Sequence, residues 1–485
     1  MISFTIALVA LVIGYFTYGR FVERIFKPDP NRRTPAVTLT DGVDYIPLPT
    51  WKIFMIQFLN IAGLGPIFGA IMGAKFGTAS FLWIVFGCIF AGATHDYLSG
   101  MLSVRHDGES LPDTIGRYLG LPTKQIMRVF SIVLLVLLGC VFVAGPAKLL
   151  SGLTPGPLDD FFWIIVVFIY YVIATLLPID KIIGKVYPLF AGALIFMAIG
   201  IMVMLYYYHP ALPEVWDTLR NTHPDAEHMP IFPMMFVSIA CGAISGFHGT
   251  QSPLMARCMT NEKYGRPIFY GAMITEGIVA LIWAAAATYF FRNGDALGTL
   301  GYHEDQAAVV VKFMTEHWLG SFGSILAIFG VIAAPITSGD TAFRSARLIV
   351  ADFLKMPQKR IANRLVISVP MFAIGIGILM WSLTDANGFS IIWRYFSWSN
   401  QTLSVFTLWA CTVYLHQTGK PWIITIIPAL FMTSVCSTYI CVAPEGFQMS
   451  QPLSYGIGGV VTLISLIAFI LYYRRYAKKN KSTIN

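Results

Sequence analysis

Charged residues are scarce in this chain of 485 residues. Asp, Glu, Lys and Arg together make up 12% of it, whereas 56% of the residues are hydrophobic. A typical soluble domain has about 25% charged residues. A water-soluble protein of this size would expose apolar surface that it has no means to hide. The composition therefore excludes a soluble enzyme, a disordered chain and a nucleic-acid-binding domain, and it predicts an all-α polytopic protein embedded in a lipid bilayer.

Cysteine is also scarce, and its seven positions are scattered without a Cys-x-x-Cys pair. Six of the seven lie in or next to apolar runs, which is typical of small buried side chains and not of a disulfide framework. Two His-Asp pairs, at 95–96 and 106–107, lack further His or Asp ligands that would converge on them. We therefore expect no metal site, no organic cofactor and no enzymatic activity.

Long apolar segments fill most of the chain. A membrane-spanning helix needs about 20 mostly apolar residues. Thirteen segments meet this condition, at about 1–19, 52–75, 79–103, 127–150, 161–178, 185–208, 231–255, 268–291, 319–343, 364–383, 389–415, 421–442 and 452–473. The first has neither the basic start nor the small-residue cleavage site of a signal peptide, so we expect it to be retained. The loops are too short for a soluble domain, and the chain is predicted to form one membrane domain.

The basic residues indicate an orientation. With thirteen spans and the N-terminus outside, 27 of the 33 Lys and Arg residues fall on the cytoplasmic side. This bias follows the positive-inside rule. We therefore expect a multi-pass protein of the cytoplasmic membrane with a cytoplasmic C-terminus, and the net charge of +8 is explained by anionic lipid.

Glycine and proline interrupt three of the spans, at 60–69, 241–253 and 334–341. Irregular backbone inside a membrane is tolerated only where it is buried in protein or lines a cavity. If the first span is set aside, the first two breaks fall in the first and sixth of ten spans. Interrupted helices at matching positions of two inverted halves are typical of the binding site of a secondary transporter.

This counting divides the chain into a core and a periphery. The two inverted halves of five spans are expected at about 51–208 and 231–415. The segments 1–20, 421–442 and 452–473 then form peripheral helices, one before the core and two after it.

The two breaks predict where a substrate binds. The N-terminal ends of half-helices carry partial positive charge and favour a carboxylate. Asn60 and Gln251 offer hydrogen bonds, and His248 is suited to gate the site or to carry a proton. The expected substrate-binding residues are Asn60, Gly63, Gly65, Ser245, Gly246, His248 and Gln251.

Ionisable residues inside the spans predict a coupling-ion site, because a buried charge costs several kcal/mol unless it is paired or solvated. Asp340 stands among hydroxyl side chains at the third break. The expected ion-coupling residues are Thr337, Ser338, Asp340, Thr341, Glu276 and Asp96. The ion is H⁺ or Na⁺. Arg394 lies within a span and needs a carboxylate partner, for which these acids are candidates.

Several short motifs resemble the carbon starvation protein A family. They are Ala62-Gly-Leu-Gly-Pro66, Ala91-Gly-Ala93 followed by Asp96, Arg105 with Asp107-Gly108 and Ser110-Leu111, Ala240-Cys-Gly-Ala-Ile-Ser-Gly-Phe-His248, Asp340-Thr-Ala342 with Arg344 and Arg347, and Asn400-Gln-Thr-Leu403. The resemblance covers about 60–402. One difference is Leu254, where the longer members of the family have a lysine.

The resemblance implies proton-coupled transport of pyruvate or short peptides. It also implies a leucine-transporter-like fold with a five-plus-five inverted repeat, as in carriers of the amino acid–polyamine–organocation type. A sodium-coupled amino acid or peptide transporter is the alternative, and a channel or a membrane enzyme is less favoured. The solute, the direction of transport and the oligomeric state stay open, and a small molecule and the bilayer are the expected partners.

Overall fold

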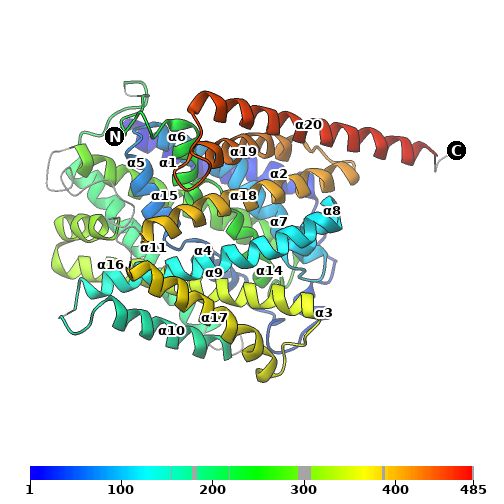
Figure 1. The fold of residues 1–485 in the computed structure, drawn as a ribbon, viewed down its shortest axis with the longest axis horizontal. Coiled ribbons are helices and arrows are strands. Elements are labelled where there is room, and N and C mark those ends of the chain that lie inside the picture. The colour runs from blue at the N-terminus through cyan, green and yellow to red at the C-terminus, as the bar shows by residue number, and fades with distance from the viewer. Residues whose placement is uncertain (155, 177–182, 218, 293–306, 385–387, 483–485) are drawn as a thin grey trace.

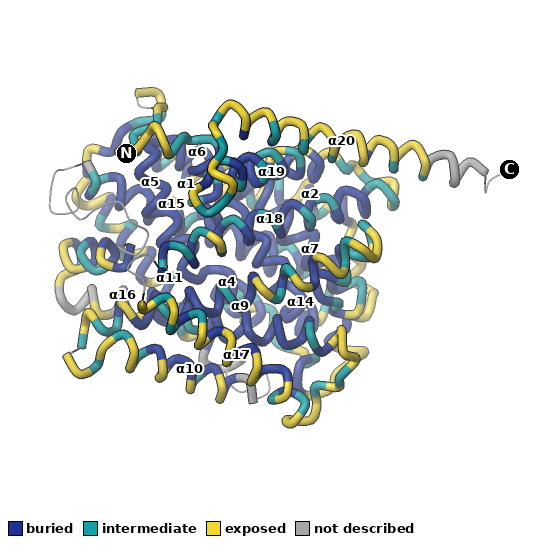
Figure 2. The backbone as a smooth tube through the Cα atoms, viewed as in Figure 1, coloured by how far each residue is buried: buried dark blue, intermediate teal, exposed yellow. Residues whose placement is uncertain are grey.

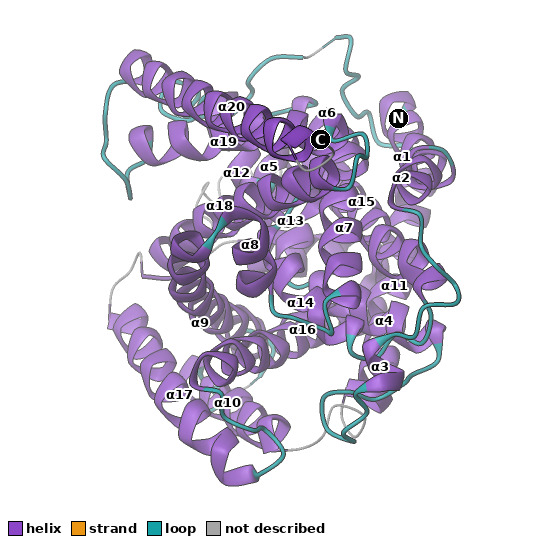
Figure 3. Cartoon of the chain, turned by 90° about the vertical axis from the view of Figure 1, so that its right-hand side faces the viewer, coloured by secondary structure: helices purple, strands orange, loops and turns teal. Residues whose placement is uncertain are grey.

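The computed structural model describes residues 1–485 except 155, 177–182, 218, 293–306, 385–387 and 483–485. Every regular element that it describes is a helix. The long helices lie side by side along the long axis of the molecule (Figure 1), and a view turned by 90° shows them more nearly end-on (Figure 3). The prediction of an all-helical protein is confirmed.

Helices of the first half of the chain are short around its first break and long after it. They are α1 (Ile2–Phe16), α2 (Tyr18–Phe26), α3 (Pro35–Thr38), α4 (Thr50–Ile61), η1 (Gly65–Gly69), α5 (Ala70–Ala74), α6 (Ala79–Phe86), η2 (Gly87–Gly92), α7 (Ala93–Arg105), α8 (Leu111–Leu119), α9 (Leu121–Ser151), α10 (Asp160–Leu176) and α11 (Ile183–Tyr208). The elements η1 and η2 are single stretches of π-helix.

Helices of the second half follow the same pattern. They are η3 (Ile231–Met235), α12 (Phe236–Ser238), α13 (Ala240–Ala243), α14 (Gly246–Ala256), η4 (Glu262–Tyr264), η5 (Arg266–Tyr270), α15 (Gly271–Arg292), α16 (Ala307–Leu354), α17 (Ile361–Thr384), α18 (Gly388–Gln417), α19 (Ile423–Val442) and α20 (Gln451–Ser482). All thirteen predicted spans coincide with helices, apart from the residues at the breaks and those outside the described ranges.

Fewer than thirteen of these helices pass a test of length and apolarity. In the described part of the chain, eight helices are long and apolar enough to cross a membrane, or nine if the bent pair of α4 with η1 and α5 counts as one span. The predicted span at 161–178 coincides with α10, which has 17 residues, and the one at 231–255 is divided among short helices. The structure thus supports a multi-pass membrane protein.

Burial separates a core from a lipid-facing shell. In the segment containing η4, η5 and α15, 89% of the most apolar stretch of 18 residues is buried inside the protein. In α20 the corresponding share is 17%. Figure 2 shows this contrast between the buried centre and exposed outer helices such as α20, α10 and α17. Large apolar side chains such as Leu463, Ile464 and Val366 are more than half exposed. In water this surface would aggregate, whereas in a bilayer it meets hydrocarbon.

The first two predicted breaks are present. The α4 helix ends at Ile61, and the next helical segment begins at Gly65 at an angle of 55° to it. The second break separates α13 from α14, where Ile244 and Ser245 adopt extended backbone conformations. Local Gly and Pro content therefore located both interruptions correctly.

The third predicted break is absent, and this prediction was wrong. The α16 helix continues through Pro335 and Gly339, and its described kink lies at Gly320. The hydroxyl of Thr337 donates to the carbonyls of Ala333 and Ala334 at 3.0 and 2.8 Å. Hydroxyl groups of this kind stabilise a membrane helix that contains proline, because they satisfy backbone groups near the ring.

An ion-pair cluster at the start of α9 joins this helix to α8, which lies outside the spans. The carboxylate of Asp113 accepts hydrogen bonds from Ser110 Oγ at 2.6 Å and from Arg128 Nη2 at 3.2 Å, and it pairs with Lys124. Burial raises the pKa of this carboxyl, but the hydrogen bonds from Lys124 and Ser110 and the nearby positive charges outweigh burial and lower it. The cluster therefore stabilises this connection at neutral pH, and its contribution is lost as the pH falls through the lowered pKa.

Candidate functional site

The two broken helices meet each other. A Cβ atom at Gly65, where the helix resumes after the first break, would lie 2.3 Å from Sγ of Cys241 on α13. A Cβ atom at Gly69 would lie 2.8 Å from the backbone carbonyl oxygen of Ser238. Only glycine permits such close approach of the two segments. The breaks, which are almost 180 residues apart in the sequence, therefore form one structural centre.

The N-terminus of α14 is capped by α18. The side-chain oxygen of Asn400 accepts hydrogen bonds from the backbone N–H of Phe247 at 2.7 Å and from Ser245 Oγ at 3.0 Å. Asn400 thus meets the positive end of the half-helix that we expected to face a substrate carboxylate. In this conformation the helix end is already hydrogen-bonded within the protein.

Gly246 provides a testable steric constraint at this contact. A Cβ atom there would lie 2.4 Å from the backbone oxygen of Asn400 and 2.5 Å from the backbone nitrogen of Ser404. We expect Gly246→Ala to destabilise the protein by about 1–3 kcal/mol, because α14 and α18 have to separate. The measurement is the thermal unfolding midpoint in detergent.

Gly456→Ala is the control for this substitution. Gly456 lies on α20, and a Cβ atom there would meet nothing within 4 Å. Alanine in an open helical position is neutral or slightly stabilising. Equal unfolding midpoints for Gly246→Ala and the wild type would contradict the steric constraint.

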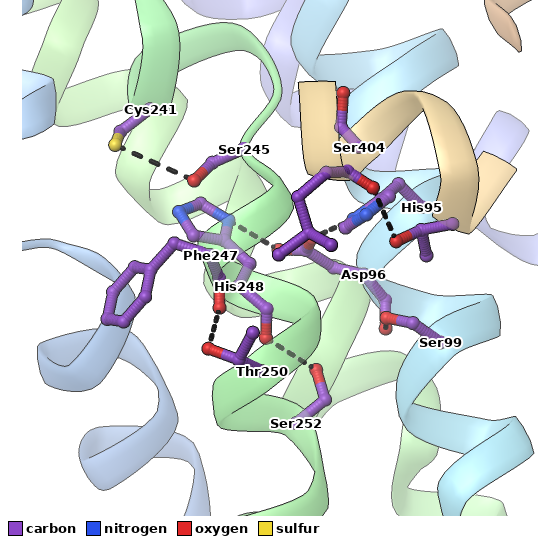
Figure 4. A network of polar contacts seen from close by, with 12 residues as sticks. His95, Asp96, Ser99, Cys241, Ser245, Phe247, His248, Thr250, Ser252 and Ser404 are labelled. Carbon is purple, nitrogen blue, oxygen red and sulfur yellow. Dashed lines mark hydrogen bonds and ion pairs between the residues drawn. The ribbon is translucent and has the colours of Figure 1, made fainter. Parts of the chain in front are cut away.

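A fully buried network of acids and histidines lies at this centre, and Figure 4 shows its members His95, Asp96 and His248. His248 Nδ1 of α14 lies 2.9 Å from Oδ2 of Asp96 on α7, and His95 Nδ1 lies 2.8 Å from the other oxygen of Asp96. On the opposite edge of its ring, His248 Nε2 lies 3.4 Å from Oε2 of Glu276 on α15. All four side chains have no exposed surface. His248 therefore lies between two carboxylates in a buried, low-dielectric site.

Cys241 lies beside this network. Its Sγ atom and the ligand atoms of His248 and Glu276 lie within 4.8 Å of one another, which is a geometry that suits a metal ion. The sulfur atom, however, is 3.6 Å from both Ser245 Oγ and Asn400 Nδ2. These hydrogen-bonding contacts account for the position of the thiol, so we do not assign a metal centre here.

Two amide side chains on α4 are buried and lack hydrogen bonds. Gln57 and Asn60 have no exposed surface, and neither amide has a hydrogen-bond partner among the described residues. The same holds for the carbonyl oxygen of the Gln251 side chain on α14. Buried polar groups are nearly always hydrogen-bonded, so such atoms just before the first break are suited to contact a polar solute.

Asp340 belongs to a second, separate cluster. Its Oδ2 atom accepts a hydrogen bond of 2.7 Å from the hydroxyl of Tyr187 on α11. Ser338 Oγ donates to the backbone oxygen of Leu59 at 2.9 Å, in the last turn of α4. The hydroxyl of Thr341 donates to the carbonyls of Thr337 and Ser338 within its own helix. The four predicted residues therefore lie together on α16, and Ser338 and Asp340 connect them to other helices.

Arg394 has a partner that we did not predict. Its Nε atom lies 3.3 Å from Oε2 of Glu445, which follows α19, and not beside Asp340, Glu276 or Asp96. Our expectation that one of these intramembrane acids pairs with Arg394 was wrong. A residue beyond the end of a neighbouring helix supplies the charge instead.

The predicted site residues thus divide between the two clusters. Gly63 and Gly65 lie at the first break, Ser245 and Gly246 at the second, and His248 joins Asp96 and Glu276. Residues of the site that we did not predict are Gln57, Cys241, Tyr187 and Asn400. Gln57 precedes Asn60 by three residues on an apolar helix, and this one-face spacing was a usable signal.

The family model of the carbon starvation protein CstA matches this chain over residues 1–157, 156–315 and 295–439. The chain belongs to the CstA family. The resemblance drawn from the short motifs is thereby confirmed.

Curated relatives span much of the chain. An uncharacterized membrane protein of Haemophilus influenzae is 43% identical over 61% of this chain and 93% of its own length. The peptide transporter CstA of Bacillus subtilis is 26% identical, and the alignment covers 94% of this chain and 93% of the length of that transporter. The pyruvate/proton symporter BtsT of Escherichia coli is 27% identical over 59% of this chain and 49% of its own.

Solved structures share the fold. The manganese transporter of Eremococcus coleocola aligns with a TM-score of 0.57 at 13% identity, over 90% of this chain and 99% of its own. A Na⁺-coupled sialic acid symporter in a substrate-bound outward-open state aligns with a TM-score of 0.55 at 13% identity. The alignment covers 95% of this chain and 96% of the symporter chain. The chain therefore has the leucine-transporter-like fold of these membrane transporters.

Proposed function

We propose that this chain is a secondary active transporter that takes up a small organic carboxylate or a short peptide together with protons. Pyruvate is the first solute to test. The observation that carries this proposal is the buried contact of His248 with both Asp96 and Glu276, at the meeting point of two broken helices.

The charges of this centre explain how a proton couples to a carboxylate. With His248 protonated and both acids ionised, the three side chains have a net negative charge, which repels an anionic solute. Like charges that share a buried site favour protonation of one of them. Glu276 is suited to take this proton, because neither of its oxygens has a hydrogen-bond partner among the described residues. A proton on Glu276 leaves the centre neutral, and the carboxylate then enters at the lowest electrostatic cost.

The solute would be held by the first and second breaks. The unpaired amide of Asn60 would donate and accept hydrogen bonds there, and the unpaired side-chain oxygen of Gln251 would accept one. Ser245 and the backbone around Gly63, Gly65 and Gly246 would complete the site. Movement of one broken helix against the other then alternates access to the site, as in other transporters with discontinuous helices.

A cavity indicates the route to this centre. It has a volume of about 320 Å³ and is lined by Met72 of α5, Ser238 of α12 and Trp393 and Arg394 of α18, among others. His223 and Asp225 of the connection before η3, which we place outside the cell, also line it. The position of this cavity supports an entrance from the outer face that leads to the contact between Gly69 and Ser238.

The proposed arrangement comprises thirteen spans in the cytoplasmic membrane, with the N-terminus outside and the C-terminus inside. One helix precedes two inverted halves of five helices at about 51–208 and 231–415, and two helices follow them. The placement of both broken helices supports this division, because they are the first helix of each half.

Sodium coupling is the second candidate, and the α16 cluster favours it. Asp340 Oδ1 has no hydrogen-bond partner among the described residues, and the hydroxyl of Ser338 bonds to a carbonyl at the end of α4. Carboxylate, hydroxyl and carbonyl oxygens suit a hard cation. Thr337 and Thr341 would complete this cluster.

Uptake into proteoliposomes tests the proposal. The purified chain is reconstituted, an inward proton gradient is imposed without sodium, and accumulation of labelled pyruvate is measured with dipeptides as competitors. We expect accumulation against the gradient that a protonophore abolishes. Accumulation only when sodium is present would establish the second candidate, and downhill equilibration alone would indicate a channel.

A further inference from the structure

Two buried arginines share one carboxylate on the half of α16 that follows Asp340. Arg344 and Arg347 are each 1% exposed. Arg344 Nη1 and Arg347 Nη2 both lie 3.7 Å from the same oxygen of Asp44, which is itself 5% exposed. Within the described part of the chain, Arg347 forms no hydrogen bond through Nε, Nη1 or Nη2. The carboxylate that pairs with the Arg347 side chain is thus shared with Arg344, and the charge of Asp340 acts on Arg347 without forming an ion pair.

This arrangement is incomplete for a guanidinium group. Arginine has five donors in a planar fork that matches a carboxylate with two hydrogen bonds, usually at 2.7–2.9 Å. At 3.7 Å the Asp44 oxygen is too distant for a hydrogen bond. Burial of a charged group without partners costs several kcal/mol. A carboxylate bound to Arg347 within hydrogen-bonding distance would supply the missing acceptors, which Asp44 at 3.7 Å does not.

The position of Asp44 links this pair to the first broken helix. Asp44 lies in the segment between α3 and α4, and α4 is the first of the two broken helices. Arg347 lies seven residues beyond Asp340 on α16, which is about 10 Å along the helix. Asp44 therefore connects the segment that leads into α4 to the helix that carries the second cluster.

We propose that Arg347, with Arg344, binds the carboxylate of the transported solute on the side of the site where α3 lies, and that this carboxylate takes the place of Asp44. The inference rests on the proposed function, because it requires a cargo with a carboxylate. Departure of Asp44 frees the segment before α4. Arrival of the cargo therefore opens a path from the site to the side of the molecule where α3 lies. The site would discriminate acids from their neutral amides, since the arginine fork requires two acceptor oxygens with negative charge.

A cysteine next to Asp44 reports this exchange without any transport. Val43 is 8% exposed, and the seven native cysteines are buried, so Val43→Cys reacts with a water-soluble maleimide mainly when the segment leaves α16. The labelling rate is measured with pyruvate, with dialanine and with the neutral amide of each. We expect each acid that is a cargo of the protein to accelerate labelling roughly tenfold. The neutral amides should leave the labelling rate unchanged.

Substitutions assign the effect to Arg347. In Arg347→Gln, we expect the acids to have no effect on labelling. Arg347→Lys keeps the buried charge without the fork, so it serves if the glutamine variant does not fold, and it should require roughly tenfold more acid. Arg360→Gln is the matched control, since Arg360 is exposed after the end of α16. This variant should respond as the Val43→Cys parent does.

Three results would overturn the inference. They are an equal effect of acid and amide, an unchanged response in Arg347→Lys, and transport of a carboxylate without accelerated labelling. Accelerated labelling by an acid that the protein does not transport would instead uphold the arginine site and contradict the proposed function.

Discussion

Replacement of His248 by alanine should reduce uptake at low solute concentration by about 10- to 100-fold. His248 is the contact between Asp96 and Glu276, and its loss leaves Glu276 without this contact and Asp96 with His95 as its remaining partner. Hydrogen bonds to charged groups contribute about 1.5–3 kcal/mol, which corresponds to this range of affinity. Both proton-driven uptake and solute exchange should be affected. The measurement is the initial rate of each in proteoliposomes.

His228→Ala is the matched control for this result. His228 forms the same kind of pair, with Nδ1 2.8 Å from Oδ1 of Asp225, but the two side chains are 78% and 56% exposed. Exposed ion pairs contribute little, so this variant should transport at the wild-type rate. If His248→Ala had wild-type kinetics in both assays, His248 would not be part of the transport pathway.

Replacement of Glu276 by glutamine should separate transport from its driving force. Glutamine has nearly the shape of a protonated glutamate, so the solute should still bind and exchange, but no proton would be carried with it. With one proton per solute, a gradient of one pH unit supports at most about tenfold accumulation. We expect the wild type to approach this ratio and Glu276→Gln to stop at equal concentrations. Labelled solute inside and outside the vesicles is measured at steady state.

Asp340→Asn and Glu316→Gln make this experiment decisive. Asp340 is the buried acid of the other cluster, whereas Glu316 is an exposed glutamate on the same helix. We expect Glu316→Gln to accumulate solute as the wild type does. Accumulation that persists in Glu276→Gln but is lost in Asp340→Asn would move the coupling site to α16.

Tyr187 offers a finer test of the second cluster. The hydroxyl of Tyr187 donates a hydrogen bond to Asp340. Substitution by phenylalanine removes this hydroxyl with little change in side-chain volume. If the α16 cluster binds the coupling ion, Tyr187→Phe should alter the ion concentration required for half-maximal uptake. If the α16 cluster does not bind the coupling ion, Tyr187→Phe should differ from the wild type in stability alone.

Local features of the amino-acid sequence were enough to predict an all-helical membrane protein and two of its three proposed helix breaks. Runs of about 20 apolar residues are a local property, so the spans are visible without knowledge of their neighbours. Gly63, Gly65 and Pro66 are likewise local signals, because they limit helix formation wherever the chain folds. The same rule failed at Pro335, where the hydroxyl of Thr337 and tight packing against other helices keep α16 continuous.

Which side chains lie next to one another became known from the three-dimensional packing of the helices. His248 and Asp96 are 152 residues apart, and Tyr187 and Asp340 are 153 residues apart. Local patterns of hydrophobicity contain no information on such pairs, because in a bilayer any of several helices can lie next to a given one. Asp44, Arg344 and Arg347 show the same limit, since a loop residue and two helical arginines become neighbours only when α4 packs on α16. Packing in three dimensions thus converted scattered buried charges into two clusters and one arginine pair, because each buried charge is tolerated only next to another polar group.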